Sequence, residues 1–245
     1  MTSAATRVHA TAVVGPGVDL GAGVVVGPHA VLMGPLEVGD EVWVGPGVHL
    51  GGPPEIGTLR HNVPWEGDLD YHPVRIGART RLRDAVTIHH GSVRETLVGA
   101  DCLLFAGSYV AHDVHIGDGV TLSAGTSVGG HATIRSGANL GLNVSVHQRR
   151  VIGPLAMIGM GTTVTRDVPP YATAYGVPPR VHGVNGFGMR RAGFADEVAD
   201  LLLKMYAGTG DPAALPDAVR AELAWWDAVP GRRPMAWATS HRGEP

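Results

Sequence analysis

The sequence predicts a mainly β protein, a parallel β-helix built from hexapeptide repeats and followed by a small C-terminal α-helical region. The first observation behind this prediction is a period of six residues in the aliphatic side chains. The second is the composition, because 245 residues include 36 glycines but only 5 Trp, 5 Tyr and 3 Phe. With 44% hydrophobic and 17% charged residues, the chain does not have the composition of a disordered protein. We therefore expect a core of small aliphatic side chains.

The repeat starts at Val8, and every sixth residue after it is aliphatic up to Ile56. The register resumes at Ile76 for three hexads and again at Val98, from which it continues to Val164. Neither an α-helix nor an ordinary strand has this period, whereas a parallel β-helix does. Glycine often follows the aliphatic residue, and we expect it and the small residue four places after the aliphatic one to allow tight corners. Three hexads close one coil, which predicts about eight coils stacked at about 4.8 Å.

Two interruptions of the register predict loops at residues 57–75 and 89–97. The first loop holds Trp65, Asp68, Asp70 and His72. Long loops on a rigid scaffold often carry function, and these two lie beside the histidines described below. We therefore expect the first loop to belong to the functional site.

A proline-rich segment after Val164 ends the repeat, and we assign residues 1–183 to the β-helix domain. In the remaining region, 184–245, the apolar period changes to that of an α-helix. A second helix is expected to open near Pro216, because proline is favoured in a first helical turn. We expect both helices to fold back along the rod and the tail from Gly231 to be loosely ordered and flexible. The two expected apolar faces consist of Phe194, Val198, Leu201, Leu202 and Met205, and of Val219, Leu223 and Trp226.

Histidines follow four strands that belong to one face of the predicted prism. A single histidine on such a surface is usually solvated or bonded to backbone. Four in successive coils on one edge favour a functional role, because chance rarely aligns them. These histidines are His89, His112, His131 and His147, which follow Ile88, Val110, Val128 and Val146.

Two kinds of chemistry fit this column. Three imidazoles could converge on a metal ion, or one histidine could act as a general base while the others bind substrate. Asp113 directly follows His112, and a carboxylate beside an imidazole fixes its tautomer and stabilises the imidazolium. Gly130, which precedes His131, offers a backbone N–H that no side chain obstructs, suited to an oxyanion. No Ser-His-Asp or Cys-His arrangement is evident, which favours direct transfer without a covalent intermediate.

Charge and cysteine content exclude several other classes. A net charge of −3 argues against nucleic acid or an anionic membrane as the main partner. The single cysteine, Cys102, excludes an intramolecular disulfide and a cysteine metal cage, and suits a reducing compartment. No apolar run reaches the roughly 20 residues of a membrane span, and the N-terminal segment lacks the pattern of a signal peptide. We therefore expect a cytoplasmic protein with no membrane span.

A more specific indication comes from six segments: VTIHHG (86–91), AHDVHIG (111–117), GGH (129–131), VHQ (146–148), DVPPY (167–171) and GVNGFGMRRAGF (183–194). In these segments the sequence resembles the UDP-N-acetylglucosamine acyltransferase family, whose members take the acyl group from acyl carrier protein. The resemblance runs from about Val8 to Phe194. It implies a left-handed β-helix and a homotrimer with active sites between subunits.

The resemblance also implies roles for individual residues. His112 corresponds to the general base, Asp113 to the group that orients it, and Gly130 to the oxyanion donor. The acyl thioester on the phosphopantetheine of acyl carrier protein would be attacked by an acceptor hydroxyl or amine that His112 deprotonates. Neither a metal nor a bound cofactor is implied. The matched substrate-binding positions are His89, His131, His147, Gln148, Asn185 and Arg191.

Three departures from the family pattern bear on specificity. In the first loop, Asp68-Leu69-Asp70 has an acid at Asp70 where the family has a lysine, which inverts a charge where an anionic nucleotide sugar would lie. In the C-terminal segment Ala192 replaces the second of two arginines, and Arg190 is the residue expected to compensate. Met160 stands where members that use long chains have glycine, which predicts a shorter acyl pocket, with Leu69 capping the chain.

The sequence therefore predicts an acyltransferase that moves a short or medium acyl chain from an acyl-carrier-protein thioester to a hydroxyl or amine of a sugar nucleotide or related small acceptor. A coenzyme A thioester is the alternative donor, because YGVPPRV (175–181) is similar to the coil-ending motif of hexapeptide-repeat acetyltransferases. A metal enzyme like the γ-type carbonic anhydrases is a further alternative, which stoichiometric zinc or iron would identify. A catalytically inactive homologue would bind ligand without forming product.

Overall fold

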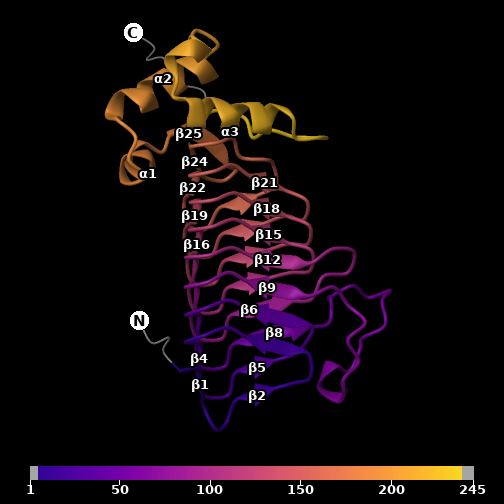
Figure 1. Ribbon diagram of the computed structural model, residues 1–245. Coiled ribbons are helices and arrows are strands. Elements are labelled where there is room, and N and C mark those ends of the chain that lie inside the picture. Colours follow the sequence, from indigo (N-terminus) through magenta and orange to yellow (C-terminus); the bar gives the residue numbers. More distant parts are fainter. Residues whose placement is uncertain (1–4, 239–245) are drawn as a thin grey trace.

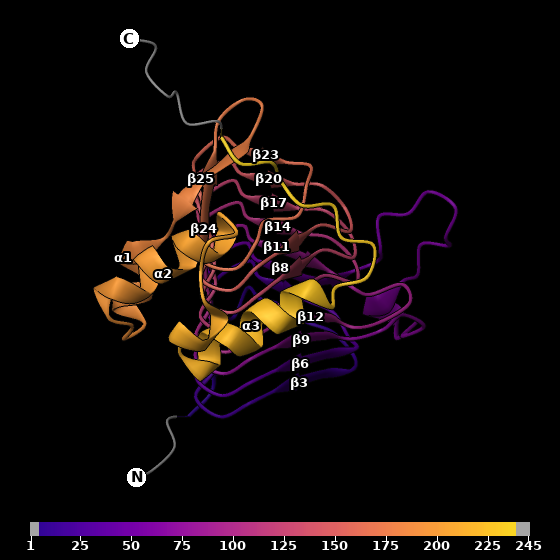
Figure 2. The same ribbon diagram turned by 90° about the horizontal axis from the view of Figure 1, so that it is seen from above.

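The computed structural model describes residues 5–238 and is a rod of stacked strands with helices at its C-terminal end (Figure 1). The N-terminal coils lie at the bottom of this view. Seen along the rod, three sheets enclose the axis (Figure 2). The predicted parallel β-helix is confirmed.

Each sheet gathers every third strand of the repeat. Sheet A contains β1 (Arg7–Val8), β4 (Val25–Val26), β7 (Trp43–Val44), β10 (Arg81–Leu82), β13 (Leu103–Leu104), β16 (Thr121–Leu122), β19 (Asn139–Leu140), β22 (Met157–Ile158), β24 (Ala172–Tyr175) and β25 (Arg180–Val184). Sheet B contains β2 (Val13–Val14), β5 (Val31–Leu32), β8 (His49–Gly52), β11 (Thr87–His89), β14 (Tyr109–Val110), β17 (Ser127–Val128), β20 (Ser145–Val146) and β23 (Thr163–Val164). Sheet C contains β3 (Val18–Leu20), β6 (Leu36–Val38), β9 (Val74–Ile76), β12 (Thr96–Val98), β15 (His115–Ile116), β18 (Thr133–Ile134) and β21 (Val151–Ile152).

Strands of successive coils pair in parallel and without a shift in the middle of the rod. Val110 in β14 pairs with Ile88 in β11 on one side and with Val128 in β17 on the other. Val128 in turn pairs with Val146 in β20. The register therefore continues across the second loop, and the four predicted histidines lie at the ends of strands of the same sheet or after them.

Two positions of each hexad fill the core. From Val26 to Val164 the aliphatic residues of the register, such as Leu82, are buried except for Ile56, and most residues four places later, such as Val86, are buried too. In the first coil Val8 and Val14 are exposed. The expectation that the later residue allows the corner is wrong. The turn is made by the residue three places after the aliphatic one, which has a left-handed backbone, as Gly119 (φ 64°) and Asp113 (φ 62°) show. Glycine and short polar residues adopt that conformation at the lowest cost.

The glycine that directly follows the aliphatic residue serves close packing of coils. A Cβ atom on Gly129 would lie 2.8 Å from the backbone nitrogen of Gln148 in the next coil. A Cβ atom on Gly141 would lie 2.7 Å from the backbone nitrogen of Met160. The expectation that these glycines form the corners is therefore wrong, because they are needed where two backbones approach each other.

The first loop begins earlier than predicted. Ile56 belongs to no strand, and Ile76 of β9 completes the third face of that coil by pairing with Val38 and Val98. The prediction that Ile56 continues the register is wrong, because Pro53 and Pro54 follow β8 and proline has no N–H to donate to the ladder. The loop covers residues 53–73 and contains the 3-10 helix η1 (Pro64–Glu66).

The second loop is shorter than predicted. It covers residues 90–95, because His89 still belongs to β11 and Thr96 already belongs to β12. An antiparallel bridge between His72 and Gly91 joins it to the first loop. Both loops therefore lie on one edge of the rod, between sheets B and C.

Helices α1 (Gly186–Arg191), α2 (Asp196–Tyr206) and α3 (Asp217–Asp227), with the 3-10 helix η2 (Pro212–Ala214), form the C-terminal region. The predicted faces of α2 and α3 meet in a second core that includes Leu202 and Val219. Helix α1 was not predicted. The helices cover the end of the rod and its last coils instead of folding back along it (Figures 1 and 2). Within the described residues, no helix combines the length and apolarity that crossing a bilayer requires.

The tail from Gly231, predicted to be loosely ordered, pairs with the last coil as far as residue 238. Pro234 forms a parallel bridge with Asp167, and Trp237 forms one with Val181 of β25. Met235 between them is 3% exposed. The expectation of a loose tail is therefore wrong for residues 231–238, and residues 239–245 lie outside the described part. The domain boundary assigned after residue 183 falls inside β25.

Candidate active site

Four predicted residues meet on the edge between sheets B and C. His112 and Asp113 form the corner after β14, and Gly130 and His131 form the corner after β17 in the next coil. Asp113 and His131 occupy the left-handed position of their corners, with φ of 62° and 60°. This backbone conformation, which L-residues rarely adopt, places both side chains on the same side of the edge. The imidazoles of His112 and His131 meet edge to face, with ring centroids 5.1 Å apart.

The Asp113 carboxylate is the most heavily bonded group of this edge. Its Oδ1 accepts the backbone N–H groups of Ser92, Val93 and Arg94 at 2.8–2.9 Å. Its Oδ2 accepts the Ser92 hydroxyl at 2.6 Å. Burial by itself would raise the pKa of this fully buried carboxyl, but the bonds from Ser92, Val93, His112 and Arg94 outweigh it and hold the pKa well below its usual range. Asp113 is therefore ionised at neutral pH.

This ionised carboxylate sets the tautomer of His112. Nδ1 of His112 lies 2.6 Å from Oδ2 of Asp113, so Nδ1 carries the proton that it donates to the carboxylate. Nε2 then has a free lone pair. A Cβ atom on Gly130 would lie 2.7 Å from that Nε2, so the backbone of Gly130 closely flanks the basic nitrogen. The arrangement provides a base whose orientation is fixed and whose proton-accepting atom faces a backbone without a side chain.

The backbone N–H of Gly130 is available to a ligand. Among the described residues it has no hydrogen-bond partner, whereas the neighbouring N–H groups of Gly129 and His131 donate to Val146 and His112. A free N–H beside the base suits a developing oxyanion. The role of Gly130 as the oxyanion donor stays a prediction, which this free N–H supports.

His131 completes the group. Its Nε2 lies 3.7 Å from Oδ2 of Asp113. Burial lowers the pKa of His131, and although Asp113 opposes that effect, the nearby cations Arg149 and Arg94 add to it. His131 is therefore favoured as a neutral group that can donate or accept a hydrogen bond.

His112, Asp113 and His131 also lie close enough together to hold a metal ion, with their ligand atoms within 4.8 Å of one another. The donor set does not fit such an ion well. Both oxygens of Asp113 already accept protein donors, one of which is His112 itself. Two imidazoles then remain, one of which is committed to the carboxylate, and a zinc site needs three converging ligands.

His89 and His147 lie on the same edge in the coils before and after this group. Nδ1 of His89 lies 2.8 Å from the carbonyl oxygen of Pro53, and its ring packs against Tyr109 at 5.4 Å between centroids. Tyr109 donates its hydroxyl proton to Glu55 of the first loop. His147 and Gln148 are exposed, and Nδ1 of His147 lies 3.1 Å from the carbonyl oxygen of Gln148. The predicted column of four histidines is therefore present, but only His112 and His131 touch.

The first loop places Asp68 and Asp70 around an arginine that the sequence did not single out. Arg60 forms ion pairs with both carboxylates, with 3.2 Å to Asp70. The acid that stands in place of the family's lysine is thus paired with a cation from its own loop. Leu69 packs against Gly17, where a Cβ atom would lie 2.8 Å from it. Within one chain Leu69 therefore contacts an N-terminal coil and not the His112 group.

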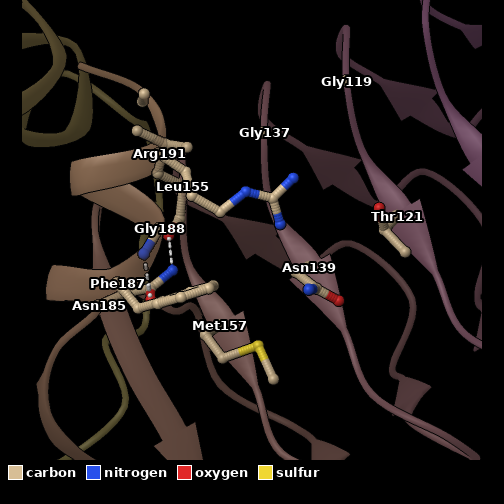
Figure 3. Close-up of a pocket in the computed structure, with 11 residues that line it drawn as sticks. Gly119, Thr121, Gly137, Asn139, Leu155, Met157, Asn185, Phe187, Gly188 and Arg191 are labelled. Atoms are coloured by element: carbon tan, nitrogen blue, oxygen red, sulfur yellow. Dashed lines mark hydrogen bonds between the residues drawn. The ribbon is translucent and has the colours of Figure 1, made fainter.

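Asn185 and Arg191 lie elsewhere, on α1 beside sheet A. They line a cavity of about 240 Å³, together with Asn139, Met157 and Phe187 (Figure 3). The amide of Asn185 is bonded at both ends, because it accepts the N–H of Gly188 as the N-cap of α1 and donates to the carbonyl of Leu155. Arg191 reaches into the cavity, with its guanidinium 6.0 Å from the ring of exposed Phe187. Asn185 therefore positions α1, and Arg191 is the group free to meet a ligand.

Arg190 and Met160 are also separate from the His112 group. Arg190 does not line the cavity and forms an ion pair with Asp196 at 2.8 Å. Met160 is 74% exposed on the edge between sheets A and B. The predicted residues thus lie in three different places on one rod, two edges and the side of sheet A. Residues that sequence reasoning missed include Ser92, Arg60, Glu55 and Phe187, and only Ser92, in the short second loop beside the column, had a usable sequence signal.

Known proteins share parts of this sequence. Residues 167–209 match the family described as UDP-N-acetylglucosamine O-acyltransferase, domain 2, and residues 95–130 match the bacterial transferase hexapeptide repeats. The acyl-[acyl-carrier-protein]–UDP-N-acetylglucosamine O-acyltransferase of Pseudomonas putida is 38% identical over 146 residues. Over these segments the chain is similar to the UDP-N-acetylglucosamine O-acyltransferases. The resemblance that the sequence motifs indicated is thereby confirmed.

Solved UDP-N-acetylglucosamine acyltransferases share the fold over nearly the whole chain. The enzyme of Francisella novicida is 25% identical, with a TM-score of 0.64 over 98% of this chain and 94% of that one. The enzyme of Campylobacter jejuni has a TM-score of 0.77 over 95% and 100%, at 19% identity. The alignment with the Pseudomonas putida acyltransferase spans 57% of each chain, so this chain matches a little over half the length of that curated relative.

Proposed function

We propose that this protein is an acyltransferase that moves a short or medium acyl chain from a thioester to a hydroxyl or amine of a sugar nucleotide or a related small acceptor. The single observation that carries the proposal is the His112–Asp113 pair at 2.6 Å, with Nε2 of His112 beside the free N–H of Gly130. The similarity to UDP-N-acetylglucosamine O-acyltransferases supplies the reaction class. By the same similarity we propose acyl carrier protein as the partner that delivers the donor.

The proposed reaction is one direct transfer. Nε2 of His112 takes the proton of the acceptor O–H or N–H as the acceptor oxygen or nitrogen attacks the thioester carbonyl carbon. The carbonyl oxygen becomes an oxyanion that the N–H of Gly130 stabilises, while Asp113 stabilises the imidazolium. The C–S bond then breaks, and the proton on Nε2 passes to the departing thiolate. The products are the acylated acceptor and the free thiol, and His112 returns to its starting state.

We further propose that the working form is a homotrimer with its sites between subunits. In support, Arg191 on sheet A, Met160 on the edge between sheets A and B, and His112 on the edge between sheets B and C cannot meet one substrate on a single rod. An edge of a second copy beside the His112 edge would bring such groups together. The resemblance to the acyltransferase family implies the same assembly.

The test is a mass-spectrometric screen of the full-length chain. Acyl-carrier-protein and coenzyme A thioesters of different chain lengths are offered with a panel of amines and nucleotide sugars. A product heavier than the acceptor by one acyl group is expected from the wild type. His112→Ala should lower kcat by about 10²–10⁴-fold without changing the melting temperature, because only the base is removed. The matched control His49→Ala removes an exposed histidine of the same sheet and should keep full activity. Turnover retained by His112→Ala would contradict the assignment of the base.

A further inference from the structure

A basic pocket lies further along the edge that carries His112. It is lined by His147, Arg150, Thr165, Arg166 and Arg233, and its volume is about 320 Å³. His147 and Arg150 come from the corner after β20, Thr165 and Arg166 from the corner after β23, and Arg233 from the tail. We call this group the arginine pocket. The tail therefore contributes to the lining of this pocket.

The charges of the arginine pocket are only partly balanced. Arg150 forms an ion pair with buried Asp167 at 3.1 Å. Asp167 also accepts the backbone N–H groups of Val151 and Arg233, so its carboxylate holds the tail in place. The guanidinium groups of Arg166 and Arg233 have no acidic partner among the described residues. In a protein with a net charge of −3, guanidiniums gathered around one cavity indicate an anionic ligand.

The distance from His112 defines what kind of anion fits. From β14, the strand before His112, the pairing runs through β17 and β20 to β23. The arginine pocket is thus two to three coils away, about 10 to 14 Å along the rod. An anion bound there is separated from the reacting carbonyl by that length of ligand.

We propose that the arginine pocket binds the phosphate ester at the far end of the donor's pantetheine arm. This inference rests on the proposed function. Thirteen bonds join the sulfur to that phosphorus, about 16 Å when extended, which is long enough to span the separation. The diphosphate of a nucleotide sugar lies only about 7 Å from a sugar hydroxyl, which is too close. A planar guanidinium can bind two oxygens of one phosphate. The same phosphate ester occurs in the pantetheine arm of acyl carrier protein and of coenzyme A, so either could be the donor.

The test compares two small donors that differ only in the phosphate, acyl-phosphopantetheine and acyl-pantetheine. For the wild type, kcat/KM should be at least about tenfold higher with the phosphate. The double variant Arg166→Gln/Arg233→Gln should reduce that ratio to near one while keeping the wild-type rate with acyl-pantetheine. The control Arg7→Gln/Arg83→Gln removes the same charge from distant exposed positions and should retain the tenfold ratio. A double variant that also retains the ratio overturns the inference.

A binding measurement separates this inference from the proposed function. Calorimetric titration with phosphopantetheine, without acceptor or acyl group, should show binding that the double variant lacks. Transfer without any preference for the phosphate would refute the arginine pocket and leave the acyltransferase proposal intact. Binding lost in the double variant, in a protein that acylates nothing, would support the pocket and refute the acyltransferase. The single variant Arg166→Gln, at an exposed side chain, repeats the test if the double variant fails to fold. Comparison of acyl carrier protein with coenzyme A thioesters then identifies the source.

Discussion

Asp113 organises the candidate site through a chain of contacts that begins in the second loop. Three consecutive N–H groups and the Ser92 hydroxyl hold its carboxylate, which in turn holds Nδ1 of His112. The left-handed backbone at Asp113 is what turns the side chain toward that loop. The base is thus oriented by a short segment whose backbone, more than its side chains, supplies the donors.

Gly130→Ala tests how closely the backbone flanks the base. The new Cβ atom would lie 2.6 Å from Cε1 of His112, so the imidazole must move away from its position beside the N–H of Gly130. We expect kcat to fall by about 10²-fold or more, with a change of less than about 2 kcal/mol in the free energy of unfolding. Steady-state kinetics and chemical denaturation check both numbers.

The control for this change is Gly57→Ala, since a Cβ atom at Gly57 meets nothing within 4 Å. It should leave kcat unchanged. If Gly130→Ala retains wild-type turnover, the proposed contact between the reacting atoms and this backbone is not used.

The second loop contains a histidine with a different role from those of the column. His90 is completely buried where the loop leaves β11, and within residues 5–238 neither of its ring nitrogens makes a hydrogen bond of good geometry, although the backbone of Pro35 and Met33 acts on the ring and opposes the effect of burial on its pKa. Burial lowers its pKa from 6.5 to about 4. His90 is therefore neutral in the folded protein at neutral pH and helps to anchor the start of the loop whose backbone holds Asp113.

This burial predicts how stability depends on pH. Between pH 6.5 and about 4 the unfolded chain binds a proton at His90 that the folded chain does not bind. The free energy of unfolding should therefore be highest above pH 6.5 and fall, by up to about 3 kcal/mol from this group, as the pH drops to about 4. In His90→Gln this part of the slope should disappear. Urea denaturation at several pH values measures this pH dependence of the free energy of unfolding in both proteins.

His9→Gln is the matched control, because His9 is exposed and stays in water in both states. It should keep the wild-type slope. A slope unchanged by His90→Gln would show that other groups cause the acid sensitivity.

Much of the β-helix could be predicted from the sequence, because the core aliphatics recur with a fixed period. The places where prediction failed have physical reasons. Ile56 fits the period, but two prolines before it remove the N–H groups that a strand needs. Helix α1 is six residues long, too short for an apolar period to reveal, and Asn185 caps it. The tail binds through backbone pairing at Asp167 and Val181, which leaves no pattern in the side chains.

Only part of the candidate site could be predicted from the sequence. The spacing of the hexapeptide repeat predicts that His112 and His131 lie in neighbouring coils on one edge, and in the structure both lie beside Asp113. The pairing of Arg60 with Asp68 and Asp70 could not be foreseen, because no repeat fixes the path of the first loop. Nor could the sequence show that the Asn185 amide is bonded at both ends.

The molecule as a whole presents its substrate-binding candidates on separate edges, and the position of Met160 makes this testable. On one rod Met160 is 74% exposed on an edge that His112 does not share, so it can limit the acyl pocket only across an interface. Met160→Gly should shift the preference toward longer acyl donors, because it removes a side chain from the end of that pocket. Chain-length profiles of kcat/KM measure the shift, and light scattering should give three times the mass of one chain.

Leu142→Gly is the matched control, an exposed apolar residue one coil below Met160 on the same edge. In Leu142→Gly the preferred acyl chain length should stay closer to that of the wild type than in Met160→Gly. An unchanged profile in Met160→Gly, or a protein that is monomeric and fully active, would contradict the proposed assembly.

The stacking of coils has a consequence for how such a protein can change its substrates. Each functional side chain is fixed to a rung, so distances along the rod are available only in steps of about 4.8 Å. Loss of one coil between β14 and β23 would bring the arginine pocket one whole step closer to His112, with no loop to take up the difference. The number of coils between two groups therefore sets, in whole steps, the length of ligand that can reach both of them. Finer adjustment, by one or two methylene groups, is left to single side chains such as Met160.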